Sequence, residues 1–210
     1  MKVKQAIEAG KISKGNGKMP GTTFAVDAFA CVTGSKLAKI KGTACHRCYA
    51  RGLQRIRPSV DKGYKLNLAK WQASNPEEWI SSMVFQLERY CTDGHHRWFD
   101  SGDLQSPEMF RQICEVARRT PGIKHWLPTQ ERGFVRAGRA LHGQEPSNLA
   151  VRVSASKVDA EPPSEPLSST VFSKRQPAGF ECQAKSRGNK CGPCRACWDT
   201  DVQTVSYPLK

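Results

Sequence analysis

Long hydrophobic runs are missing from this sequence, and no stretch approaches the roughly 20 apolar residues that a membrane helix requires. No apolar segment follows the basic amino terminus, so we expect no secretory signal peptide. Acidic residues are also scarce: 19 Asp and Glu stand against 33 Lys and Arg, a formal net charge of +14. These features predict a cytoplasmic protein without membrane contact, whose partner is a polyanion and most simply nucleic acid.

Cysteine is the residue whose distribution is most informative. Two of the nine, Cys91 and Cys114, stand alone inside helical patterns, and the other seven form two tight groups. A reducing compartment, the odd count and the Cys-x-x-Cys spacings favour metal ligands over disulfides. The groups are Cys31, Cys45 and Cys48, and Cys182, Cys191, Cys194 and Cys197.

The first cysteine group follows the first expected strand. Three thiolates there would hold three irons of a [4Fe–4S] cluster and leave the fourth iron open to a ligand. The same three would also suit zinc, with water or the adjacent His46 as fourth ligand. A third interpretation is that Cys31 is simply a buried strand residue.

The second cysteine group has the spacing C-x8-C-x2-C-x2-C, which places four thiols within sixteen residues. Four thiolates close a tetrahedral zinc site or hold a second iron–sulfur cluster. The spacing predicts a metal of one kind or the other. Arg187, Lys190 and Arg195 interleave with these ligands, where they would contact phosphate or offset thiolate charge.

Capping signals and apolar periodicity predict alternating strands and helices. We expect strands within residues 22–32, 96–103, 123–129, 149–156 and 170–172, and helices within 49–71, 75–91, 106–120 and 131–142. His95 and His96 are expected in a turn. This order predicts an α/β fold, a partial (β/α) barrel of parallel strands. The expected organisation is a basic flexible arm (1–20), the barrel domain (21–175) and a cysteine-rich metal-binding tail (176–210) appended to it.

Chemistry in such folds gathers where the strands end at their carboxyl termini. Four segments are therefore expected on one rim, namely residues 31–48, 100–105, 129–131 and 154–157. Among them Asp100 and Asp103 are candidate catalytic residues, a general base and a substrate anchor. The alternative is that Asp-Ser-Gly-Asp is ordinary turn chemistry.

A short Arg-rich helix supplies a candidate nucleic-acid surface. Arg132, Arg136 and Arg139 recur at four- and three-residue spacing, which places three guanidinium groups on one face. With Lys124 and the Lys-rich arm they would bind phosphate. A solvated helix face is the ordinary alternative.

The order of these parts resembles that of radical S-adenosylmethionine (SAM) enzymes. Cys45-His46-Arg47-Cys48-Tyr49 is similar to the end of their cysteine triad, and Ser101-Gly102-Asp103 to the motif that holds the SAM amino group. The triad spacing is longer here, and Asp replaces the usual Glu. The resemblance implies that SAM chelates the open iron and that its reductive cleavage gives a radical that abstracts a substrate hydrogen. It implies cofactor contacts from Tyr49, Ser101, Gly102, Asp103, Ser154 and Ser156.

Two narrower resemblances point to different outcomes. The segments KMPGTTFAV, CHRCYA, SGDLQSPE and the carboxyl-terminal CxxCxxC resemble phage proteins of the gene product 88 type over residues 18–198, which implies a protein of the host cytoplasm. DSGDLQ is similar to the DSGGFQ segment of tRNA-guanine transglycosylases. That implies a base-exchange enzyme with structural zinc, in which Asp100 recognises the base. A third hypothesis is a non-catalytic, zinc-stabilised nucleic-acid-binding protein.

Overall fold

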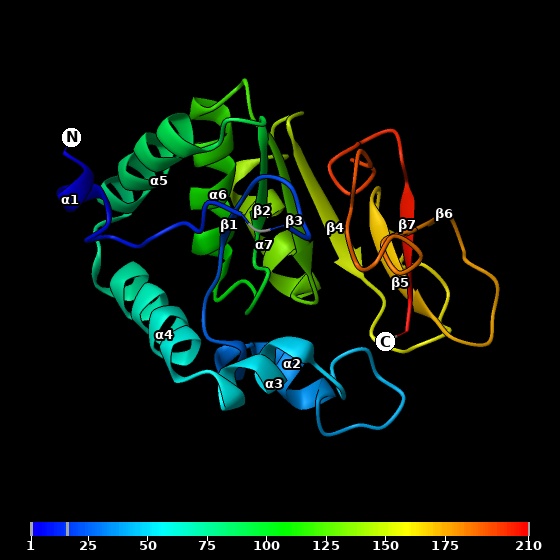
Figure 1. Ribbon diagram of the computed structural model, residues 1–210. Helices are drawn as coiled ribbons and strands as arrows, with labels where there is room; N and C mark the ends of the chain where they lie inside the picture. Colours follow the sequence, from blue (N-terminus) through cyan, green and yellow to red (C-terminus); the bar gives the residue numbers. More distant parts are fainter. Residues whose placement is uncertain (1, 16, 210) are drawn as a thin grey trace.

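The protein is built around one all-parallel seven-stranded sheet (Figure 1), seen in a computed structural model that describes residues 2–15 and 17–209. The strand order is β1-β2-β3-β4-β5-β7-β6, and within the described residues the sheet is open, with β1 and β6 as its edges. The strands are β1 (Thr22–Phe24), β2 (His95–Trp98), β3 (Lys124–Thr129), β4 (Leu149–Ser154), β5 (Ser168–Phe172), β6 (Phe180–Glu181) and β7 (Thr204–Pro208). The predicted α/β class and parallel pairing are confirmed.

Helices fill most of the intervals between the first four strands. They are α1 (Val3–Ala6), the 3-10 turn η1 (Ala28–Ala30), α2 (Val32–Leu37), α3 (Tyr49–Ile56), α4 (Pro58–Ala73), α5 (Pro76–Tyr90), α6 (Pro107–Arg119) and α7 (Arg132–His142). Two helices begin where capping signals predict. Asn75 accepts a hydrogen bond from the Glu77 amide, and Ser106 accepts one from the Met109 amide at 3.1 Å. No helix among the described residues has the length and apolar character to cross a bilayer.

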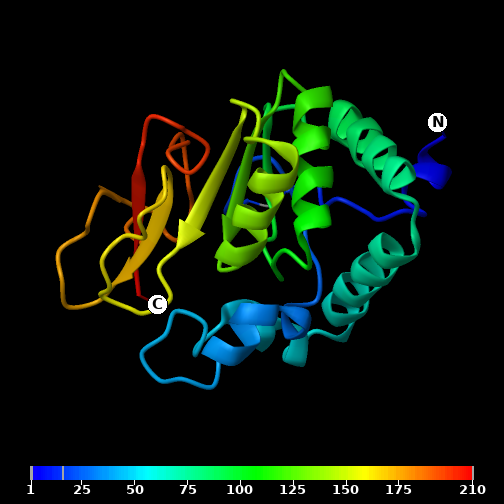
Figure 2. The same ribbon diagram turned by 180° about the vertical axis from the view of Figure 1, so that it is seen from behind.

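The hydrophobic core lies between the sheet and the helices on one of its faces. Figure 2 shows α6 and α7 across that face, with α5 beside α6. Alternate residues of β2 and β3 point into it: Trp98 and Leu127 are completely buried there, and so are His96 and His125. His96 and His125 are therefore core residues, and the turn expected at His95 and His96 is part of β2.

The opposite face of the sheet is covered by the second cysteine segment. Arg97, Trp126 and Arg152 lie on this face, called the inner face below. Trp198 packs edge-to-face on Trp126 at a centroid distance of 5.2 Å, and its indole N–H donates to the His96 carbonyl at 2.8 Å. The tail also contributes β6 and β7 to the sheet, so it is integrated into the fold and is not an appendage.

Two further expectations differ from the structure at the amino-terminal end. The first strand ends at Phe24 because Asp27 caps η1, accepting from the Phe29 amide at 2.9 Å, so Cys31 is not a strand residue. The described part of the expected flexible arm packs on the body: Ala6 is completely buried, and Ile12 is 4% exposed within the core. The many Lys residues of this segment suggested a flexible arm, and they gave no sign of its apolar contacts with the core.

Candidate metal and cofactor site

The first cysteine group lies at the carboxyl edge of the sheet, where α2 and α3 stand beyond the end of β4 (Figure 1). Cys31 is the residue before α2, and Cys48 is the residue before α3. The loop with Cys45 is joined to the segment after β4, because the Ala44 amide donates to the Ser156 carbonyl at 3.0 Å. Residues distant in sequence therefore meet at one edge.

A gap between two sulfur atoms is kept open by Gly34. A Cβ atom at this position would lie 3.6 Å from the Cys31 Sγ and 3.7 Å from the Cys45 Sγ. Both sulfurs thus border one small space that any other side chain would begin to fill. This cradle is the feature of the site that best suits a ligand shared by the thiols.

Two buried carboxylates join the strand ends to the cysteine segment. Asp103 accepts from the Thr129 hydroxyl at 2.6 Å and the Gln130 amide at 2.8 Å, which ties the turn after β2 to the end of β3. Glu131 accepts from the Thr33 amide at 2.6 Å and the Thr33 hydroxyl at 2.7 Å. The first turn of α2 is thereby held against the end of β3, next to Cys31.

Burial and the nearby negative charges raise the pKa values of the carboxyl and thiol groups at this edge. Burial raises the pKa of Asp103 to about 7. Burial, followed by the charge of Asp103, raises the pKa of the Cys31 thiol well above its ordinary value. Burial and the neighbouring Cys48 raise the pKa of Cys45 to about 12. A bound cation would reverse this balance and favour the thiolates.

The donor set fits a metal by its chemistry, although the side chains stand further apart than ligands do. Among the residues that the structure describes, no three His, Cys, Asp or Glu side chains converge as a bound metal requires. Cys31 and Cys45, which border the space at Gly34, and the nearby Cys48 offer only soft sulfur donors, which iron–sulfur clusters and zinc accept. Binding would need the three cysteine side chains to approach one another more closely than they do in this structure.

The expected cofactor residues are placed around the same edge. Tyr49, on the first turn of α3, donates its hydroxyl to the Asp100 carbonyl. Ser101 is 3% exposed, and its carbonyl accepts from the Val26 amide at 3.0 Å. Gly102 has a φ of +82°, and a Cβ there would lie 2.3 Å from a Val26 methyl, so only glycine fits.

Of the two expected serines after β4, one joins the rim and one does not. Ser156 donates to the Gln130 side chain at 3.2 Å, and Gln130 in turn donates to the Ala155 carbonyl at 3.3 Å. Ser154 instead pairs with the Ser169 hydroxyl of β5 at 3.0 Å. The structure therefore brings Ser156 to Gln130 and Asp103, and leaves Ser154 between two strands.

Asp100 differs from Asp103 in having a free acceptor. Its Oδ1 is buried and has no hydrogen-bond partner in the described part of the chain. Burial raises its pKa, and the positive charge of Arg97 opposes that shift. The Nε of Arg97 is likewise buried without a partner. Sequence reasoning missed Arg97, although the alternation along β2 places it opposite the core residues His96 and Trp98.

The second cysteine group is fixed to the body through its backbone. The Cys182 amide donates to the Ser206 carbonyl of β7 at 2.8 Å, and the Cys191 amide donates to the Lys18 carbonyl at 2.8 Å. Burial raises the pKa of Cys191, and so do the neighbouring Cys182 and Cys194. The segment with the second cysteine group is thus anchored to β7 at Cys182 and to residue 18 at Cys191.

The expected nucleic-acid residues do not form one surface. Lys124 is the first residue of β3, whereas Arg132 follows the last residue of β3, so the two lie at opposite ends of the strands. Arg139 is paired with Glu145 at 2.6 Å and Glu165 at 3.1 Å, which leaves its side chain 13% exposed. The other expected residues differ in exposure: Arg132 and Arg195 are half-buried, and Arg136, Arg187 and Lys190 are exposed.

A more concentrated positive surface surrounds the first cysteine group. Residues 28–60 contain no acidic residue, and six of their cations are exposed without an ion pair in the described part of the structure. These residues, called the basic rim below, are Lys36, Lys39, Lys41, Arg47, Arg55 and Arg57. The absence of Asp and Glu over 33 residues is the sequence signal that identifies it.

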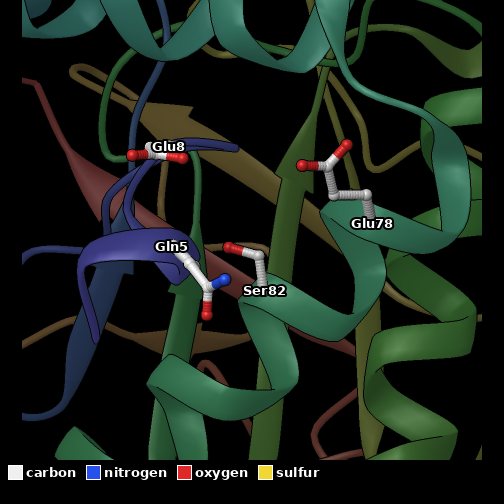
Figure 3. Close-up of a pocket in the computed structure, with 4 residues that line it drawn as sticks. All are labelled: Gln5, Glu8, Glu78 and Ser82. Carbon is white, nitrogen blue, oxygen red and sulfur yellow. The ribbon is translucent and has the colours of Figure 1, made fainter. Parts of the chain in front are cut away.

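A hollow of about 320 Å³ lies elsewhere, between α1 and α5 (Figure 3). Gln5, Glu8, Glu78 and Ser82 line it, and two of these are carboxylates. It contains no cation to receive an anionic ligand and no thiol to bind a soft metal. The candidate site is therefore the carboxyl edge of the sheet, not this hollow.

Fold and site together define a class, that of open parallel α/β proteins with cysteine groups at the sheet's carboxyl edge and on its inner face. The chain belongs to the Gene product 88 family, whose family model matches residues 4–200. Neither the curated proteins nor the solved structures gave a significant match. The resemblance to gene product 88 proteins is confirmed, and the resemblance to radical SAM enzymes stays a prediction.

Proposed function

We propose that this protein is an iron–sulfur enzyme of the radical SAM kind, built on a partial (β/α) barrel and acting on a nucleotide or nucleic acid. The observation that carries the proposal is the cradle at Gly34, where the sulfurs of Cys31 and Cys45 border one space. Its position at the carboxyl ends of parallel strands supports chemistry at this edge.

The protein's own residues would hold and shield the reacting groups. Cys31, Cys45 and Cys48 would hold a [4Fe–4S] cluster, which with SAM supplies one-electron chemistry directed at an unreactive C–H bond. Asp103 and Glu131 are positioning residues, because their oxygens are occupied by hydrogen bonds to Thr129, Gln130 and Thr33. Ser156 and the main chain of Ser101 and Gly102 remain to contact the cofactor.

Metal and acid-labile sulfide analysis of anaerobically prepared protein tests this proposal. We expect iron and sulfide in the parent and a loss of about one cluster's iron in Cys45→Ala. Cys91→Ala is the matched control, since Cys91 is half-buried and lies outside both groups. Equal iron in Cys45→Ala and the parent would refute the cluster at the first group.

A polyanionic substrate is supported by the basic rim. Six exposed cations next to the cysteine group would attract phosphate, and counterion release would make binding fall steeply with salt. Lys39→Glu with Lys41→Glu should weaken oligonucleotide binding at least tenfold and flatten its salt dependence. Arg132→Glu with Arg136→Glu is the matched control, and an equal loss there would refute a site at the basic rim.

A base-exchange enzyme with structural zinc is the second candidate, and the free Oδ1 of Asp100 favours it. A buried carboxylate oxygen without a donor suits an N–H group of a bound base. Stoichiometric zinc without sulfide, together with incorporation of labelled guanine into tRNA or DNA that Asp100→Asn abolishes, would select this candidate. Iron with sulfide would exclude it.

A further inference from the structure

Arg152 is a buried cation with no acidic partner. Its side chain lies on the inner face of β4 and is completely buried, and it forms no ion pair within the described residues. The guanidinium donates to backbone carbonyls of the second cysteine segment, to Cys197 at 2.9 Å and to Ala196 at 3.0 Å. Carbonyl dipoles satisfy the hydrogen bonds, but they do not neutralise a charge removed from water.

Arg97 is a second enclosed cation on the same face. Its guanidinium lies over the Trp126 ring at 4.5 Å, and its Nε has no hydrogen-bond partner in the described residues. It forms no ion pair within 4.0 Å there. Arg97 and Arg152 therefore both lie on the inner face, and neither forms an ion pair within 4.0 Å in the described residues, although Asp100 acts on Arg97 and Asp199 on Arg152 from further away.

One sulfur atom connects these groups. The Cys197 Sγ lies 3.1 Å from the Tyr207 hydroxyl, on the strand that the tail places inside the sheet. Burial lowers the pKa of Arg152, and the charges of Tyr207, Cys197 and Asp199 oppose that shift. For Arg97 the charges of Tyr49, Asp100, Tyr207 and Cys197 outweigh burial and raise the pKa. Tyr207 thus contacts the Cys197 sulfur, Arg152 contacts the Cys197 carbonyl, and Arg97 acts on Cys197 through its charge.

We propose that Tyr207, Arg97 and Arg152 form the charge-balancing shell of a four-thiolate metal centre at Cys182, Cys191, Cys194 and Cys197. Four thiolates around a divalent ion carry a net charge of about −2, which two guanidiniums offset. The Tyr207 hydroxyl donates to the Cys197 sulfur. The inference goes beyond the proposed function and rests on the metal that the cysteine spacing predicts at the second group. It assigns the residues that offset the charge of that metal centre inside the fold.

Cobalt(II) titration of the full chain tests the shell without any measurement of activity. Cobalt replaces zinc in thiolate sites and gives a sulfur-to-metal absorption band. The parent and every variant also carry Cys31→Ser and Cys45→Ser, so that cobalt can bind only at the second cysteine group. Outer partners of metal ligands are typically worth 10- to 100-fold in affinity, so we expect Tyr207→Phe and Arg97→Met each to bind cobalt about tenfold more weakly or worse.

Lys190→Met is the matched control, because it removes one positive charge next to Cys191 from an exposed side chain. We expect it to change cobalt affinity less than about twofold, since water screens its charge. Tyr207→Phe removes a single oxygen, so it tests the shell even if the arginine variants unfold, which circular dichroism would reveal.

The two possible failures are distinguishable. A parent protein without a thiolate band, or one whose band survives Cys194→Ser, would refute the metal at the second cysteine group and leave the proposed function at the first group untouched. A parent that binds cobalt while Tyr207→Phe and Arg97→Met match Lys190→Met would leave the metal in place and overturn the shell.

Discussion

Acid sensitivity should originate in two buried histidines of the core. The Thr120 hydroxyl donates to the Val116 carbonyl at 2.8 Å, so it accepts from the Nε2–H of His125 at 2.9 Å. The Nδ1 of His125 is buried and has no hydrogen-bond partner among the residues that the structure describes. The ring of His96 lies 5.7 Å from that of His125 between centroids. Burial lowers the pKa of His125 from 6.5 to about 3, and that of His96 also falls, so both rings are neutral in the fold.

The size of the effect follows from the difference in proton binding between the folded and unfolded states. Because the folded pKa of His125 lies below the unfolded value of 6.5, its stabilising contribution is complete above pH 6.5 and declines as the pH falls. Between pH 7 and pH 5 one such histidine removes about 2 kcal/mol from the free energy of unfolding. The decline should level off near pH 3, and His96 acts in the same direction.

Urea unfolding of His125→Gln at pH 7 and pH 5 measures this contribution. Glutamine keeps an N–H near the Nε2 position but does not titrate, so the variant should lose about 2 kcal/mol less than the parent over this range. Comparison with the parent is essential because the raised pKa of Asp103, about 7, stabilises the fold as the pH falls. His142→Asn, at an exposed position, is the control. Equal losses in parent and His125→Gln would refute the reasoning.

Three other substitutions test the edge of the sheet. Gly102→Ala should lower the free energy of unfolding in urea by about 1–3 kcal/mol. Gly63→Ala is the control, because Gly63 lies in a helix with open space around it, and it should be neutral or slightly stabilising. Equal effects of the two substitutions would contradict the steric argument. Glu131→Ala should lower iron content at the first cysteine group, and the surface variant Glu108→Ala should not; similar iron in both would show that Glu131 does not position that group. Arg139→Met should lower the free energy of unfolding by roughly 2–4 kcal/mol, because it removes an ion-pair partner from two half-buried carboxylates, and it should not change oligonucleotide affinity. A loss of affinity without a loss of stability would show that Arg139 binds phosphate.

Local signals predicted much of the fold. Asn75 and Ser106 cap helices through their own neighbours, so a short window of sequence contains the whole interaction. Cys31 shows the limit of such windows. Its surroundings alternate like a strand, yet the Asp27 cap and the distant Glu131 carboxylate fix a helix start there.

Long-range pairing decided what the sequence could not predict. Arg139 looked like a phosphate ligand because nothing near it reveals Glu165, which is 26 residues away and pairs with it. Arg97 was missed because the alternation along β2 identifies its face only once His96 and Trp98 are known to lie in the core, and a four-residue strand does not reveal that by itself. The strand β7 was missed because it follows a cysteine-rich segment that the spacing presented as a separate unit.

The position of β7 sets an order for assembly. In the chain β6 precedes β7, but in the sheet β7 lies between β5 and β6. Among the described strands β6 pairs with β7 alone, so its two residues join the sheet only together with β7 or after it. Cys182 directly follows β6, so the second cysteine group is complete only after β7 has joined the sheet. We therefore expect any metal bound by the second cysteine group to be loaded only once β7 has joined the sheet.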